Sequence, residues 1–105
     1  MRYNKLVRDL VPPTLQASGR KVVTRTIVGE ELQRALRSAI DDAVTKFDAA
    51  QDDDHATSTL ADLVEIITAI ARQRGCSENR MMQLRATRSS QLGVYDRGIF
   101  LVEMD

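Results

Sequence analysis

Aromatic residues are scarce in this sequence, which has no tryptophan, two tyrosines and two phenylalanines among 105 residues. The core must therefore be aliphatic, and the chain lacks the aromatic side chains on which single-stranded nucleic-acid binders stack bases. Net charge is absent too, because fifteen Lys and Arg residues balance fifteen Asp and Glu residues. No overall field draws the chain to nucleic acid or to an anionic membrane, so we expect neither partner. Any site for a polyanion must be local.

Cysteine and long apolar runs are also scarce. The single cysteine, Cys76, excludes an intrachain disulfide and a zinc cluster built from several cysteines. The opening MRYNKLVRDL has no apolar run like that of a signal peptide. The most apolar region, LADLVEIITAIA, is interrupted by Asp62, Glu65 and Thr68, so nothing is expected to span a membrane. We expect a cytoplasmic protein that folds as one domain over residues 1–105.

Helical periodicity dominates the first half of the chain. The segment PPTLQAS, residues 12–18, predicts a short helix that ends at Gly19. A long helix is expected after Gly29, a suitable N-cap, and should end near Ala50. Its apolar residues recur at helical spacing, which predicts that one face is buried against a neighbour.

Two more helices are expected in the second half. Asp54, Thr57 or Ser58 can cap the first, which Gly75 closes. Its apolar stripe is wider than one neighbouring helix covers, and a homodimer or homotetramer is therefore expected. The stripe consists of Leu60, Leu63, Val64, Ile66, Ile67, Ile70 and Ala71. Ser77 caps the last helix, which is predicted to run to about residue 88.

Two segments have the composition of strands. KVVTRTIV, residues 21–28, is rich in β-branched residues and alternates, and GIFLVEM, residues 98–104, supplies a possible partner. The predicted fold is therefore mostly α: three long helices and a short N-terminal helix, with a small two-stranded β ribbon.

Four segments carry a family resemblance: NKLVRDLVP at 4–12, RKVVTRTI at 20–27, LADLVEIITAIARQRGCS at 60–77 and VYDRGIFLVEM at 94–104. In this order they resemble the MazG-like nucleotide pyrophosphohydrolases, specifically the short branch similar to phosphoribosyl-ATP pyrophosphohydrolase. The resemblance implies an all-α, oligomeric bundle in which carboxylates from two antiparallel helices hold Mg²⁺. It also implies hydrolysis of a nucleoside triphosphate or related nucleotide to a monophosphate and pyrophosphate.

The family's acidic pattern is E-E-x-x-E on the first long helix and E-x-x-D on the second. Clustered carboxylates one helical turn apart suit Mg²⁺, which prefers oxygen ligands. On the second helix this chain has Thr59-Leu60-Ala61-Asp62, so Asp62 keeps an acid and Thr59 has lost one. Glu65, one turn further on, is a plausible additional ligand.

The first long helix allows two alignments with the family pattern. In one, Asp41, Asp42 and Thr45 take the acidic positions, but at about 100° per residue they lie opposite the apolar face. In the other, Asp42, Ala43 and Lys46 take them and lie along the border of that face. We prefer the second alignment.

This alignment leaves few of the family's acids. Asp42 and Asp62 remain as metal ligands assisted by Glu65, and the predicted catalytic set is Asp42, Asp62 and Lys46. Mg²⁺ binding is expected to be weak or to depend on the nucleotide. The Lys46 ammonium can contact phosphate directly, which supports binding better than hydrolysis. A surface ion pair between Asp42 and Lys46, four residues apart, explains these two residues equally well.

The resemblance also implies basic residues beside the nucleotide phosphates. They are Lys5, Arg8, Arg85, Arg88 and Arg97, with Arg8 the best candidate for a bidentate contact. The family's R-G-G-F appears here as Leu92-Gly93-Val94-Tyr95, and we expect Tyr95 to pack under the ribbon rather than to stack on a base. Two functions therefore compete: a Mg²⁺-dependent nucleotide pyrophosphohydrolase, or a catalytically inactive nucleotide-binding or assembly protein on the same scaffold.

Overall fold

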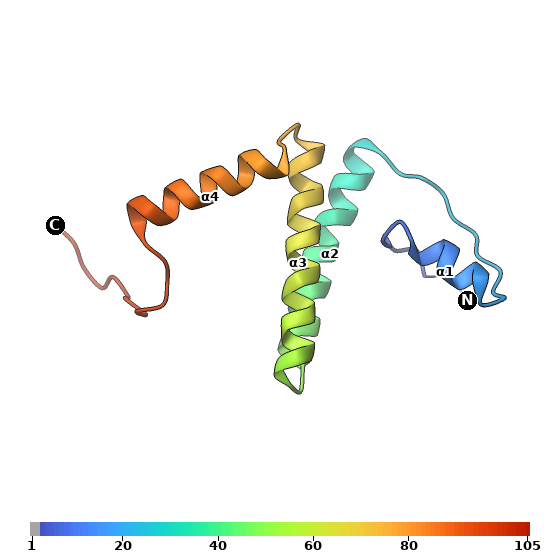
Figure 1. Cartoon of the computed structure of the whole chain (residues 1–105), viewed down its shortest axis with the longest axis horizontal. Helices are drawn as coiled ribbons and strands as arrows, with labels where there is room; N and C mark the ends of the chain where they lie inside the picture. Colours follow the sequence, from blue (N-terminus) through green and yellow to red (C-terminus); the bar gives the residue numbers. More distant parts are fainter. Residues whose placement is uncertain (1–2) are drawn as a thin grey trace.

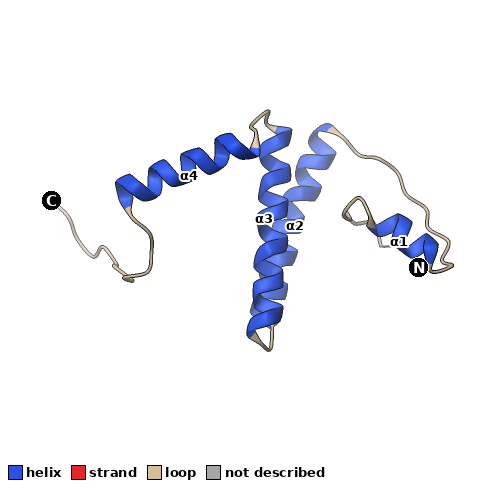
Figure 2. Ribbon diagram, in the orientation of Figure 1, coloured by secondary structure: helices blue, strands red, loops and turns tan. Residues whose placement is uncertain are grey.

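The computed structural model describes residues 3–105, and this part of the chain contains four α-helices and no strand (Figures 1 and 2). The helices are α1 (Val11–Ala17), α2 (Gly29–Ala49), α3 (Asp53–Gln73) and α4 (Glu78–Leu92). The predominantly helical fold that periodicity predicted is confirmed. None of these helices is long and apolar enough to cross a membrane.

The centre of the molecule is an antiparallel hairpin formed by α2 and α3, which lie side by side (Figure 1). Only residues 50–52 join the two helices. Leu36 and Ala43 of α2 are 5% and 6% exposed, and Thr68 of α3 is 2% exposed. The Thr68 hydroxyl donates a hydrogen bond to the carbonyl of Val64 at 2.9 Å, which satisfies its polar atom inside the hairpin.

Side-chain caps fix where α3 and α4 begin. The Asp52 carboxylate accepts a hydrogen bond from the backbone N–H of His55 at 2.8 Å, and this contact lowers the pKa of Asp52. The three expected caps at positions 54, 57 and 58 were therefore wrong, because all three residues lie inside α3. Ser77 accepts from the backbone N–H of Arg80 at 3.1 Å, which confirms the predicted cap of α4. α2 begins at Gly29 itself, with Val28 as N-cap.

The helices α1 and α4 lie outside the hairpin. Helix α4 contacts only α3 and projects away from it, and α1 packs on none of the other helices in the described part of the chain (Figure 1). The molecule measures 60 × 36 × 24 Å and has a radius of gyration of 17.8 Å. A compact chain of this length has a radius of about 13 Å. A single copy is thus an open shape built around one two-helix core.

The predicted β ribbon is not formed within this chain. Residues 21–28 are extended on the side of the hairpin where α1 lies, and residues 98–104 are extended beyond the far end of α4 (Figure 1). The hairpin and the projecting α4 stand between the two segments, so they cannot pair. In a single copy, therefore, neither of these strand-like segments has a strand to pair with.

The extended segment before α2 is tethered by one ion pair. Arg25 donates to both carboxylate oxygens of Glu31 in the first turn of α2, with an Nη1 to Oε1 distance of 3.1 Å. These hydrogen bonds lower the pKa of Glu31 and raise that of Arg25. The segment is therefore held beside the N-terminus of α2 at one point.

Because the hairpin core is small, truncation of one buried side chain should have a large effect on stability. We expect Leu36→Ala to lower the free energy of unfolding by about 2–5 kcal/mol, because it removes buried methyl groups and leaves a cavity between α2 and α3. Leu10→Ala is the matched control, since Leu10 is exposed and the same change there should cost less than about 0.5 kcal/mol. Urea unfolding of the unchanged protein and the two variants measures both changes in the free energy of unfolding. Equal stabilities of the two variants would contradict this description of the core.

The Arg25–Glu31 pair predicts a pH dependence. The lowered pKa of Glu31 means that the pair stabilises the fold at pH values above the carboxyl's unfolded pKa. This contribution disappears as the pH falls through the lower, folded-state pKa. An NMR titration should place the Glu31 pKa below the ordinary value of a glutamate carboxyl and return it toward that value in Arg25→Gln. An identical pKa in both proteins would show that the pair does not form.

Candidate functional site

One ion pair links two residues that the sequence marks as functional. The Nη1 atom of Arg8, in the N-terminal loop, lies 3.2 Å from Oδ1 of Asp62 on α3, although the two residues are 54 positions apart. Both side chains are more than half exposed. The predicted phosphate-binding arginine therefore meets the predicted metal ligand. Both side chains remain open to solvent and to a ligand.

The hairpin places Asp42 and Asp62 at nearly the same height. Residues 42 and 62 are nearly equally far along the chain from the middle of the short connection between α2 and α3. At a rise of about 1.5 Å per residue, the two positions differ by only about 3 Å along the hairpin axis. Both residues are exposed.

The surroundings of Asp42 favour the second alignment of the family pattern. Ala43 is buried between α2 and α3, whereas Asp41 and Thr45 are exposed and the Thr45 hydroxyl bonds back to the Asp41 carbonyl. A methyl group thus stands where the family pattern has an acid facing the neighbouring helix. Lys46 is exposed and forms no ion pair with Asp42, so the simple surface pair between them is not made.

No three-carboxylate metal site is assembled in one copy. Within residues 3–105, no group of three or more His, Cys, Asp or Glu side chains is arranged to hold a metal ion. Asp42, Asp62 and Glu65 are therefore not brought together as one cluster. Each remains an exposed carboxylate on the hairpin. A cation that binds here needs further oxygen ligands from elsewhere.

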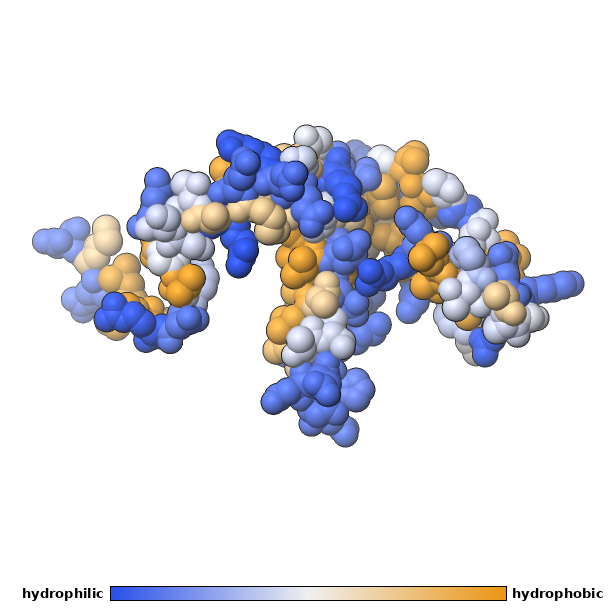
Figure 3. All heavy atoms as spheres, viewed as in Figure 1, coloured by the Kyte–Doolittle hydropathy of each residue, from blue (hydrophilic) through white to orange (hydrophobic). Residues whose placement is uncertain are grey.

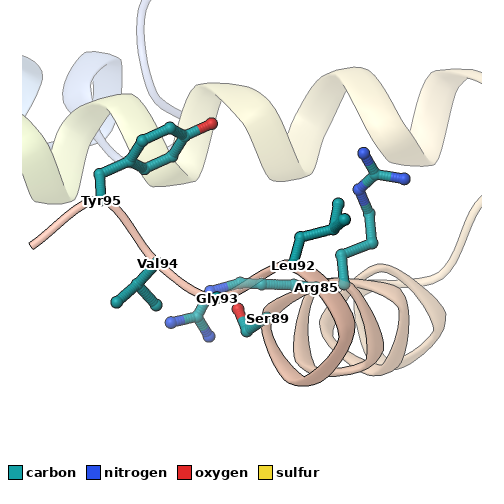
Figure 4. Close-up of a pocket in the computed structure, with 7 residues that line it drawn as sticks. Arg85, Ser89, Leu92, Gly93, Val94 and Tyr95 are labelled. Atoms are coloured by element: carbon teal, nitrogen blue, oxygen red, sulfur yellow. The ribbon is translucent and has the colours of Figure 1, made fainter. Parts of the chain in front are cut away.

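A second group of predicted residues lies at the end of α4. Arg85, Arg88 and Tyr95 line an open hollow of about 390 Å³, together with the end of α4 and Gly93. Figure 4 shows Tyr95 on one side of this hollow and Arg85 on the other. Tyr95 is 97% exposed, so the expectation that it packs under a ribbon was wrong. Tyr95 begins a turn in which the backbone N–H of Gly98 donates a hydrogen bond to the Tyr95 carbonyl at 3.0 Å.

The predicted phosphate-binding residues do not form one site in a single copy. Lys5 and Arg8 belong to the N-terminal loop, and Arg97 lies in the C-terminal segment outside the hollow lined by Arg85 and Arg88. The loop and the hollow lie on opposite sides of the hairpin (Figure 1). The five basic residues are therefore divided between two places.

Sequence reasoning missed the direct contact of Arg8 with Asp62. Sequence reasoning gave the two residues separate roles. The only sequence feature that could have indicated their contact is their opposite charge, in two segments that both carry the family resemblance. It also missed Ser89, which lines the hollow beside Arg88. One turn of helix separates Arg85 from Ser89, a spacing that places both on one face of α4.

Comparison with known proteins adds no relative: no family model, no curated protein and no solved structure matches this chain.

The Arg8–Asp62 pair predicts a small but measurable coupling. A double-mutant cycle with Arg8→Ala and Asp62→Ala should give an interaction free energy of about 0.2–1 kcal/mol, because the pair is exposed. The coupling should weaken in high salt, since counterions screen exposed charges. Zero coupling at low salt, measured by urea unfolding, would contradict this arrangement of the N-terminal loop.

Proposed function

We propose that this chain is a nucleotide pyrophosphohydrolase-like protein that hydrolyses a nucleoside triphosphate or related nucleotide to a monophosphate and pyrophosphate. The observation that supports it best is the contact between Arg8 and Asp62. Two segments that were each assigned to nucleotide chemistry come together in space, with a guanidinium and a carboxylate exposed side by side. The family resemblance is the basis for the proposed reaction, and the contact supports the location proposed for it.

The residues of this place have distinct chemical roles in the proposal. The Arg8 guanidinium presents paired N–H donors that match two phosphate oxygens, and Asp62 orients that guanidinium before the nucleotide arrives. Lys46 adds a point charge that contacts phosphate directly. Asp42, at nearly the same height as Asp62, contributes a second carboxylate on α2. The basic residues attract the polyphosphate, and the acids set its position.

A magnesium ion fits these residues only together with the nucleotide. Asp42 and Asp62 offer one carboxylate each, with Glu65 one turn from Asp62, and no three of the described acids form a cage. Mg²⁺ commonly uses one or two carboxylates, substrate phosphates and several waters, so this donor set is sufficient when phosphate is present. When bound, the ion would neutralise phosphate charge and favour attack by water.

A second candidate function is nucleotide binding or assembly without catalysis. It is favoured by the buried methyl of Ala43 and by the cation of Lys46, which occupy two positions where the family pattern has acids. An ammonium cannot lower the pKa of a bound water as a metal ion does. In this case the same basic residues hold a nucleotide that is not cleaved.

The proposed protein is a homodimer or homotetramer. Besides its packed residues, the hairpin carries a second apolar stripe that is exposed, partly visible in Figure 3 along α3. The stripe consists of Val44, Phe47, Leu60, Val64 and Ile67. The accessible surface of the chain is 9796 Å², whereas a compact monomer of this mass exposes about 5,900 Å². The excess of roughly 3,900 Å² per copy is larger than the roughly 1,000–2,500 Å² that each partner contributes to a large obligate interface, so such an interface has enough surface to form on.

Nucleotide turnover tests the proposal. Incubation with a panel of nucleoside triphosphates and Mg²⁺ should release pyrophosphate, and Asp62→Asn should lower the rate by more than about tenfold, because it removes a charged ligand. Asp48→Asn is the matched control, since Asp48 is an exposed acid on the same hairpin outside the site, and should leave the rate unchanged.

Calorimetric titration separates the two functions. Nucleotide binding that requires Mg²⁺, together with turnover, supports the hydrolase. Binding that persists in a chelator and is weakened by Arg8→Ala, without turnover, supports the non-catalytic function. Absence of both binding and turnover across the panel would rule out the hydrolase and the nucleotide-binding form of the second function, and would leave only assembly.

A further inference from the structure

Two extended segments of this chain have unpaired backbones. Within residues 21–28 and 98–104, the one backbone N–H that donates a hydrogen bond to another residue is that of Gly98, which bonds to the Tyr95 carbonyl. Of the carbonyls in these segments, only that of Val28 accepts a backbone hydrogen bond, from Leu32. Rows of free donors and acceptors on extended chain are templates for strand pairing.

The side chains of both segments suit a sheet, and most of them are left in solvent, with Val22 and Ile27 half-buried. Val23 is 100% exposed and Phe100 is 87% exposed, and Ile99, Leu101, Val102 and Met104 are also exposed. Leaving such residues uncovered forgoes about 25 cal/mol for each Å² of apolar surface. Alternation along both segments would place side chains on two faces of a ribbon, as β pairing requires.

The two segments carry opposite charges. The first has Arg20 and Lys21 at its start and Arg25 in its middle. The two acids that follow it are already paired, Glu31 with Arg25 and Glu30 with Arg34. The second, residues 98–104, contains Glu103 and is flanked by Asp96 and Asp105, against one neighbouring basic residue, Arg97. Like segments would repel each other, whereas the first and second segments attract. The charge pattern therefore favours the mixed pair over self-pairing of either segment.

We propose that residues 21–28 of one copy pair as a β ribbon with residues 98–104 of a second copy. Within one copy the hairpin separates the segments, and α4 carries the C-terminal segment away from it (Figure 1). A second copy related by a two-fold axis places each C-terminal arm against the partner's tethered segment, so two identical ribbons form and the assembly closes. The inference rests on the self-association proposed above and specifies which segments make it.

The Arg25–Glu31 pair contributes to this exchange, in which each copy pairs its C-terminal segment with residues 21–28 of the other copy. By holding the first segment beside the start of α2, it presents the free backbone edge at a fixed place. The C-terminal segment of the second copy, carried by α4 and the residues that follow Gly93, then supplies the partner strand. The apolar stripe on α3 remains available for helix contacts between the same two copies.

Cysteine cross-linking between two distinguishable copies tests the exchange. In a Cys76→Ser background, one protein carries Thr24→Cys and the other carries a cysteine at position 99, 100, 101 or 102. The two proteins are unfolded together, refolded and mildly oxidised. Paired strands hold opposite Cα atoms about 4.5–5.5 Å apart, within disulfide reach. We expect a covalent dimer in at least one mixture and none with either protein alone. Ser38→Cys, exposed on α2, replaces Thr24→Cys as the control and should not cross-link.

Two other results would overturn the exchange in different ways. A protein that carries both cysteines in one chain and yields only an internally linked monomer would show that α4 folds back to form the ribbon within one copy. Sedimentation separates the remaining cases: dimers without a cross-link at any of the four positions refute the exchange alone, and a monomer refutes self-association as well. Neither result bears on nucleotide turnover, which is measured independently.

Discussion

The packing of α2 against α3 is the constraint on which the rest of this structure depends. Leu36, Ala43 and Thr68 are its fully buried residues, and every other element is attached to this hairpin at an end or through a single ion pair. A hairpin of two helices buries too little apolar surface to offset the conformational entropy of a chain of this length. This shortage of buried surface is the physical reason for proposing that a second copy completes the core.

The same packing determines the chemistry of the candidate site. Because Ala43 faces α3, the position from which a carboxylate would enter the space between the helices holds only a methyl group. The remaining acids, Asp42 and Asp62, stand in solvent on the hairpin, and one of them is engaged by Arg8. The site is therefore poorer in fixed negative charge than the family pattern implies, and richer in cations that suit phosphate. In the proposed function, nucleotide binding would therefore need fewer residues than hydrolysis.

Much of the secondary structure could be predicted from the sequence, because helical spacing and capping act locally. The end of α1 near Gly19, the length of α2 and the Ser77 cap all follow from residues within a few positions. The cap of α3 was misplaced because the run of acids from residue 52 offered several equivalent candidates. The ribbon was wrong because strand composition indicates that a segment needs a partner without indicating which chain supplies it. For the site, helical spacing placed Ala43 on the apolar face, where it is buried, whereas the Arg8–Asp62 contact is a long-range consequence of the fold that no local pattern contains.

The most direct test of this account is the dependence of unfolding on protein concentration. If a single copy cannot complete its core, folding is coupled to association, and the urea midpoint must rise as the protein concentration increases. The account predicts such a rise, with a native mass that is a multiple of 11.8 kDa. A cooperative transition whose midpoint is independent of concentration, in a protein of 11.8 kDa native mass, would contradict it.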